Sequence, residues 1–260
     1  MTSGRSVLPP TAQADEKECG HVASKELPNQ TRREMTMKKF VVYFLMVVLS
    51  SFVSCTHSKM MTITPDYRNT ALLDRSLLIC LVPNTVHVNN AYYVNDSFGE
   101  GDSMSLYLEF FKAQLPVSMK DISRFKTIGF GSPQSTNPFH STSFVTAERD
   151  SFDVMLPDAG TTVELDGQTP EIVLFVQDLT TETVESFHWN ANGGYSAPAL
   201  MQKANCVFWD NRSGKVILFG QVESQAENFF PTFTKGLWEK GLDGFARTLI
   251  KQSPFYSTPE

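Results

Sequence analysis

Four cysteines, five histidines and 28 acidic residues are the side chains of this 260-residue chain whose types could carry chemistry. A thiol can be acylated, oxidised to a disulfide or bound to a metal, and two carboxylates can share acid and base roles. Cys55 differs from the other cysteines in what precedes it: Lys38 and Lys39, then 14 residues without a charge, Phe40–Val53, and a serine. Cys55 is therefore the residue whose chemistry the sequence specifies best.

The uncharged run Phe40–Val53 is shorter than a membrane span. A helix needs about 20 apolar residues to cross a bilayer. A basic start, an apolar core of about 7–15 residues and small residues at its end instead define a secretory signal. We therefore expect a cleaved signal peptide. The alternatives are a buried apolar element that happens to end in cysteine and an uncleaved signal anchor.

The residues Phe52-Val53-Ser54-Cys55 resemble the lipobox of bacterial lipoproteins. The resemblance implies that the Cys55 thiol receives a diacylglycerol and that a dedicated signal peptidase cuts before it. Acyl chains such as palmitate then hold the mature protein on a membrane. Phe52 stands where leucine is usual, whereas Val53 and Ser54 fit the pattern. Thr56, in place of the aspartate associated with inner-membrane retention, favours a periplasm-facing anchor in the outer membrane. The inner membrane and the cell surface are the alternatives.

This resemblance divides the chain into four parts. Residues 1–36 are polar and unpatterned, and we interpret them as a disordered leader or an over-extended start, with Met35 or Met37 as the initiator. The signal peptide then covers 37–54, the lipidated cysteine and a tether cover 55–70, and a single globular domain covers 71–260.

The charge of the mature part restricts its partners. Of the 22 Lys/Arg and 28 Asp/Glu residues, seven and five lie before Cys55, which leaves 15 basic and 23 acidic residues and a net charge of −8. Such a domain lacks the basic surface that contacts nucleic-acid phosphates. It would also not dock electrostatically on an anionic membrane, so we expect attachment through lipid and a partner within the envelope.

Two further cysteines, Cys80 and Cys206, lie in the predicted domain, while Cys19 lies in the leader. An exported protein can form disulfides, so Cys80 and Cys206 are a candidate pair. Each lies inside an apolar, strand-like run, and the alternative is that both are small buried hydrophobic residues.

Carboxylates offer the next candidate chemistry. Asp178, Glu182 and Glu185 follow the most strand-like segment of the chain, 171–179. Side chains at the end of such a strand can line a site, and they can equally begin a solvated helix. If the protein is a hydrolase, Asp178 and Glu182 are its candidate acid and base.

Nucleophile and metal motifs give no such candidate. The sequence Gly129-Phe130-Gly131-Ser132 is followed by Pro133, whereas a nucleophile elbow continues into a helix. The histidines lack ligand spacing, and no glycine-rich phosphate loop occurs. We therefore predict no catalytic, metal-binding or cofactor-binding residues.

The expected elements give an α/β (α+β) fold. Strands are predicted at 77–82, 125–130 and 171–179, and a hairpin pairs 203–209 with 215–222 across a turn that ends in Gly214. Helical spacing predicts one helix beginning near Met104, capped by Asp102 or Ser103, and another over 232–251. The Asn-rich stretch 86–101 reads as a loop. This order indicates a mixed β-sheet with two main helices packed on one face.

The order of strand, hairpin and helix over 170–250 resembles small periplasmic lipoproteins of unknown function, including ones with the fold of the TolB amino-terminal domain and curli-secretion lipoproteins. The resemblance implies a non-enzymatic envelope lipoprotein. It would bind a protein, lipid or glycan, or serve an assembly or transport system. The alternatives are a peptidoglycan or glycan hydrolase and a structural subunit of a surface assembly.

Overall fold

The structure, a computed structural model, describes residues 61–70, 72–133, 139–146, 150–190, 193–228, 233–251 and 253–257. These residues all lie in the compact unit Ser54–Glu260. Its strands are β1 (Thr62–Ile63), β2 (Ser76–Leu81), β3 (Val86–Val88), β4 (Thr127–Phe130), β5 (Phe139–Val145), β6 (Ser151–Pro157), β7 (Ile172–Asn190), β8 (Gly193–Asp210) and β9 (Lys215–Glu227). Its helices are η1 (Pro65–Tyr67), α2 (Ala91–Phe98), α3 (Ser103–Lys120) and α4 (Lys235–Ile250).

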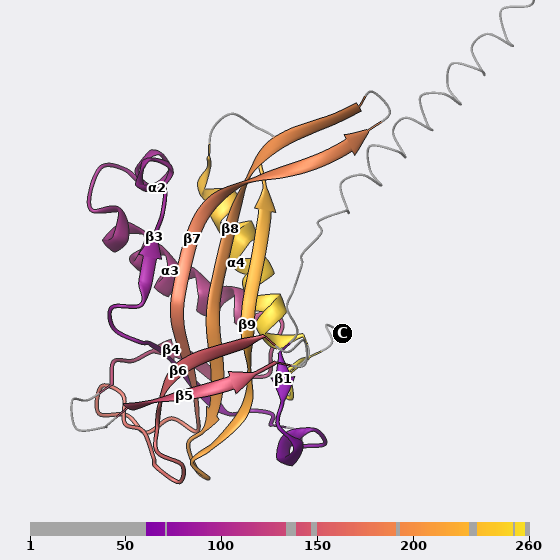
Figure 1. Cartoon of the computed structure of the whole chain (residues 1–260). Helices are drawn as coiled ribbons and strands as arrows, with labels where there is room; N and C mark the ends of the chain where they lie inside the picture. The colour runs from indigo at the N-terminus through magenta and orange to yellow at the C-terminus, as the bar shows by residue number, and fades with distance from the viewer. Residues whose placement is uncertain are drawn as a thin grey trace, which may run out of the picture. The chain divides into compact units, whose positions relative to one another are not determined.

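The main sheet is mixed, as predicted. Its strand order is β1-β9-β8-β7-β2-β4, with β3 pairing beside the middle of β7. Strands β7, β8 and β9 are antiparallel neighbours, whereas β2 runs parallel to both β7 and β4. Strands β5 and β6 form a separate antiparallel pair, which crosses one part of the main sheet while the ends of β7 and β8 extend past it (Figure 1).

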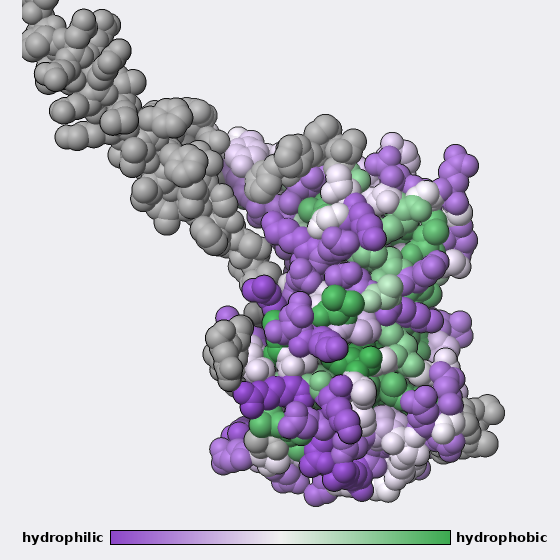
Figure 2. Space-filling view, turned by 180° about the vertical axis from the view of Figure 1, so that it is seen from behind, coloured by the Kyte–Doolittle hydropathy of each residue, from purple (hydrophilic) through white to green (hydrophobic). Residues whose placement is uncertain are grey.

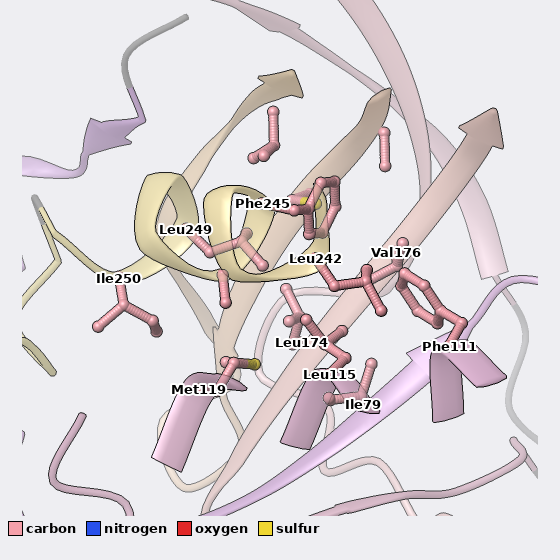
Figure 3. Packing of buried hydrophobic residues seen from close by; sticks show 14 of the residues in the cluster. Ile79, Phe111, Leu115, Met119, Leu174, Val176, Leu242, Phe245, Leu249 and Ile250 are labelled. Atoms are coloured by element: carbon pink, nitrogen blue, oxygen red, sulfur yellow. The ribbon is translucent and has the colours of Figure 1, made fainter. Parts of the chain in front are cut away.

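Helices α3 and α4 pack on one face of this sheet, as expected for the two main helices. Figure 3 shows α3 and α4 directing apolar side chains toward the same strand residues of β2 and β7. The contacts bury Phe111, Leu115, Met119, Leu242, Phe245, Leu249 and Ile250 of the helices against Ile79, Leu174 and Val176 of the strands. Figure 2 shows this side from outside, where hydrophobic residues reach the surface among hydrophilic ones.

The β5–β6 pair covers the opposite face of the same strands. Phe152, Val154 and Leu156 of β6 are buried with Val173 and Phe175 of β7 and with Val207 and Trp209 of β8. Successive side chains of a strand point to opposite faces, so the first half of β7 is buried on both sides. This explains its continuous apolar sequence, Ile172–Val176.

Several predicted boundaries agree with the structure. Helix α4 and strand β4 lie within the predicted segments, β2 begins and ends one residue before its predicted segment, and the β8–β9 hairpin contains the predicted one. The carboxylate of Asp102 caps α3 by accepting a hydrogen bond from the Ser105 amide at 3.0 Å. Helix α3 continues through Pro116 to Lys120.

Two predictions of local structure are wrong. The Asn-rich stretch 86–101 contains β3 and α2 instead of a loop, because Val94 is fully buried and Phe98 packs on the core. The segment after Leu179, where the strand was predicted to end and a solvated helix was an alternative, continues β7 to Asn190 because it pairs with β8 along its whole length. Its polar residues lie on a sheet that is exposed at this end.

The domain also begins earlier than predicted. Residues 61–70 were assigned to the tether, but Met61 and Tyr67 are buried and Thr62–Ile63 pair with β9. None of the helices in the described part of the chain has the length and hydrophobicity that a membrane crossing requires.

Candidate functional site

The predicted lipidation residue, Cys55, lies outside the described residues. The described chain begins six residues later with Met61, whose side chain is 6% exposed. Thr64 then fixes the entry to the fold, since its amide and hydroxyl donate to the carbonyl of Ile217 at 2.9 and 3.0 Å. Six residues of extended chain span at most about 20 Å, so a lipid on Cys55 would hold the domain close to the membrane.

The candidate disulfide between Cys80 and Cys206 is wrong for this structure, because both cysteines are free and fully buried. Cys80 lies opposite Phe175, and Cys206 lies opposite Val176. Consecutive residues of β7 face opposite sides, so the two thiols belong to different cores, one under β5–β6 and one under the helices. Burial raises the pKa of Cys80 to about 12 and also raises that of Cys206. Both therefore act as small hydrophobic residues.

Histidines and acidic residues form no metal centre in the part of the chain that the structure describes, where no group of three or more potential ligands occurs. His140 lies 3.6 Å from Asp158, and His188 lies 3.6 Å from Glu227. The Ser132 amide donates to Asp166 at 3.0 Å, so Ser132 lies in a turn that this carboxylate holds.

The turn between β8 and β9 holds a separate polar cluster. The Tyr67 hydroxyl donates to Asp210 at 2.7 Å and lies 2.9 Å from the Ser213 hydroxyl, which also donates to Asp210 at 2.9 Å. Burial raises the pKa of Tyr67 to about 12. Nearby, Glu171 accepts hydrogen bonds from Arg75 and Arg212, and the bond from Arg75 chiefly lowers its pKa. These partners satisfy each other, so the cluster fastens the turn to the rest of the fold.

A cavity of about 300 Å³ opens on the face of β7–β9 that carries the β5–β6 pair. Across the strands Thr180 pairs with Lys203, Lys203 with Glu223, and Asn205 with Gln221, so these side chains share that face. The residues that line the cavity are Asp178, Thr180, Lys203, Ala204, Asn205, Gln221, Val222 and Glu223.

A β-bulge places Asp178 at this cavity. The pairing of β7 with β8 shifts between Gln177 and Thr180, and Asp178 has a φ of 52°. Aspartate and asparagine tolerate this left-handed conformation better than most residues, and bulges often redirect a side chain. Here the carboxylate turns toward β8, where it accepts a hydrogen bond from the Asn205 amide at 2.8 Å.

The side-chain amides of Asn205 and Gln221 extend this bond into a series of two hydrogen bonds that run in one direction. A carboxylate only accepts hydrogen bonds, so the amide nitrogen of Asn205 must face Asp178 and its oxygen must face Gln221. Gln221 donates to that oxygen at 3.0 Å. Asn205 is 8% exposed. These two hydrogen bonds therefore fix its side chain at the floor of the cavity.

The charges around the cavity are unequal. Lys203 donates to Glu182 at 3.1 Å. The side chain of Glu223, which faces Lys203 across the strands, forms no ion pair or hydrogen bond with the described residues. Among the described residues that line the cavity, Asp178 and Glu223 contribute carboxylates and Lys203 contributes an ammonium group. The ammonium group of Lys203 is already paired with the carboxylate of Glu182.

The sequence identified part of this site. Asp178 and Glu182 were candidates and lie on the same strand, but Glu182 lies outside the cavity and Glu185 is exposed further along β7. The candidate residues did not include Lys203, Asn205, Gln221 and Glu223. A signal for them exists, since polar residues stand two positions apart, on one face, at the start of the first predicted hairpin strand and at the end of the second.

Comparisons with known proteins leave the family open. No family model matches the chain, and no curated protein matches it. Among solved structures, the chain is similar to the hypothetical protein CT253 from Chlamydia trachomatis, with a TM-score of 0.26 and 12% identity over 58% of this chain and 72% of that chain. A likeness at this TM-score supports no assignment of function.

Proposed function

We propose that this chain is a lipid-anchored envelope lipoprotein whose domain binds a partner and does not catalyse a reaction. The observation that carries this proposal is the position of Cys55, which directly follows a signal-type segment and lies six residues before the buried Met61, where the described structure begins. The anchor would lie in the outer membrane with the domain in the periplasm. The partner would be an envelope protein, a lipid or a glycan.

The exposed end of the sheet supports a binding role. Strands β7 and β8 continue past the β5–β6 pair (Figure 1), and Phe187 and Tyr195 on them are 62% and 42% exposed, on opposite faces of the two strands. The rings of His188 and Tyr195 stack with centroids 5.1 Å apart. Exposed aromatic residues are typical of interaction surfaces. A hydrolase that uses Asp178 and Glu182 has less support, because Lys203 occupies the carboxylate of Glu182.

Metabolic labelling with palmitate tests the anchor. The wild-type chain should incorporate label, the Cys55→Ala variant should incorporate none, and the matched variant Cys19→Ala should label like wild type. Cys80 and Cys206 are buried and serve as internal controls. Equal labelling of wild type and Cys55→Ala would overturn the proposal.

Chemical cross-linking in intact cells tests the partner. The wild-type chain should form a discrete cross-linked product, and substitution of the exposed residues Phe187 and Tyr195 by serine should reduce it. Exposed Tyr92 on α2 provides a control substitution on another element. If these substitutions left the cross-linked product unchanged, the partner would bind at another surface of the domain.

A further inference from the structure

We infer that the cavity at the β7 bulge binds a protonated amine, carried either by a small ligand or by a side chain of a partner. This inference names the ligand chemistry of the binding domain proposed above. It rests on that proposal for its biological setting, but it does not depend on lipid at Cys55.

The size of the cavity limits the ligand. Its volume is about 300 Å³, which is at the lower end of the range of about 300–1,000 Å³ for small-molecule sites. Such a cavity admits one sugar ring or one long side chain, and it is too small for a folded element of a partner. The ligand group is therefore a single terminal moiety.

The hydrogen-bonding groups of the cavity favour a donor. The carboxylates of Asp178 and Glu223 are hydrogen-bond acceptors, and a carboxylate offers about four acceptor positions. In the described structure one position of Asp178 is used by Asn205, while Asn205 itself accepts from Gln221. An ammonium group supplies three donors and no acceptor, which matches the acceptors that remain.

The charge balance distinguishes an ammonium from a neutral hydroxyl group. Lys203 is the cation that lines the cavity, and its ammonium bonds to Glu182. The carboxylates of Asp178 and Glu223 therefore face the cavity without a cation of their own among the described residues. Both side chains are half-buried, and two carboxylates that face one cavity attract an opposite charge, so a bound cation is favoured over a neutral ligand of the same size.

The site is also held in place before a ligand arrives. The left-handed backbone of Asp178 is fixed by the bulge, and the Thr180 hydroxyl donates to its carbonyl at 3.3 Å. Asn205 and Thr180 are 8% and 9% exposed. Preorganised groups bind with a smaller loss of conformational freedom, so even a small amine should bind measurably.

Calorimetric titration of the full chain in a nonionic detergent, at slightly acidic pH, tests the inference. The probes are glucosamine, which represents a small free amine, and Nα-acetyl-lysine amide, whose free ε-amine represents a partner side chain. N-acetylglucosamine is the neutral control. We expect saturable binding of at least one amine and none of the neutral sugar.

The variants Glu223→Gln and Asp178→Asn keep the shape of each side chain and remove its charge. Because a hydrogen bond to a charged group is about twice as strong as a neutral one, each variant should weaken amine binding about fivefold or more. Glu109→Gln is the matched control, since Glu109 is exposed on α3, on the other side of the sheet. It should bind the amine like wild type.

Each outcome decides the question. Binding of glucosamine alone assigns a free ligand, and binding of the lysine derivative alone assigns a partner side chain. Binding of neither amine, equal binding of N-acetylglucosamine, or equal weakening by Glu109→Gln and Glu223→Gln would overturn the inference. Cys55→Ala should bind like wild type, so failure of the lipid anchor and failure of this site are distinguishable.

Discussion

Asp210, at the turn between β8 and β9, shows how one carboxylate can link distant parts of the chain. Its oxygens accept hydrogen bonds from Tyr67, 143 positions away, and from the Ser213 hydroxyl and the Arg212 amide within the turn. Burial tends to raise its pKa, but the hydrogen bonds outweigh burial and hold the pKa of Asp210 below its ordinary value. The folded state therefore stabilises the ionised form.

This pKa shift predicts a pH-dependent contribution to stability. A carboxyl with a lowered pKa in the folded state contributes stability above its unfolded pKa of about 4, and the contribution is lost as the pH falls through the folded pKa. Asp210→Asn should therefore lower the free energy of unfolding by about 1 kcal/mol near neutral pH and by less below pH 4. Thermal unfolding followed by circular dichroism across this pH range measures the difference.

The exposed residue Asp96, which has no partner among the described residues, provides the comparison for Asp210. Asp96→Asn should unfold like wild type at every pH. If the deficit of Asp210→Asn were constant from neutral pH to pH 3, ionisation of Asp210 would not be its cause.

The two buried cysteines show what sequence reasoning lacks at this scale. The apolar runs around Cys80 and Cys206 correctly predict buried strands, but strand content does not determine which face each residue takes. That choice depends on the order β8-β7-β2 and on the register that sets Cys80 opposite Phe175 and Cys206 opposite Val176. Sheet order is a long-range property, so the disulfide could only be a hypothesis.

At the scale of elements, strand β7 explains both the success and the failure of the predictions. Its first half is apolar because both of its faces are covered, and the sequence identifies it readily. Its second half carries Glu182 and Glu185, and glutamate is depleted in strands. This half is a strand because β8 pairs with it. The cavity was missed for the same reason, since it requires the bulge and three aligned strands.

The bulge itself gives a prediction about Asp178. Its φ of 52° disfavours residues with a β-carbon other than aspartate and asparagine by about 1–2 kcal/mol. Asp178→Ala should therefore lower the free energy of unfolding by about this amount, and loss of the bond to Asn205 adds to it. Denaturant titration of Asp178→Ala and Asp178→Asn compares the two.

Asp178→Asn keeps an acceptor for Asn205 and tolerates the left-handed backbone, so it should unfold close to wild type. An alanine variant as stable as the asparagine variant would show that neither the backbone conformation nor the hydrogen bond limits this site.

Helix α4 gives the second prediction at this scale. Phe245 is fully buried and lies between α3 and the sheet, where its ring centroid is 6.2 Å from that of Phe111 (Figure 3). Removing a buried phenylalanine side chain costs about 3–5 kcal/mol, so Phe245→Ala should unfold at a much lower denaturant concentration. Phe187→Ala, at a 62% exposed position, should cost less than about 1 kcal/mol. Equal costs would contradict the packing described for α4.

At the scale of the whole molecule, the entry of the chain and the cavity lie close together. Thr62 of β1 pairs with Phe219, and Gln221, which lines the cavity, is two residues further along β9, a distance of about 7 Å. With a tether of at most about 20 Å, a lipid on Cys55 would keep the cavity within about 30 Å of the membrane. The proposed amine would then be sought in the layer of the envelope nearest the membrane surface.

If the chain is cleaved before Cys55 as proposed, the net charge of residues 55–260 predicts that lipid is their only direct means of attachment to a bilayer. With a net charge of −8, the domain is repelled by anionic lipid headgroups, and this repulsion weakens as salt rises. A version exported by a cleavable non-lipoprotein signal, so that it begins at Thr56, should therefore be recovered in the soluble periplasmic fraction at low and at high salt. The lipidated wild type should remain with the membranes under both conditions. If the lipid-free form were recovered with the membranes and high salt released it, a basic patch on the domain would be responsible. If high salt did not release it, a membrane-bound partner would be replacing the lipid.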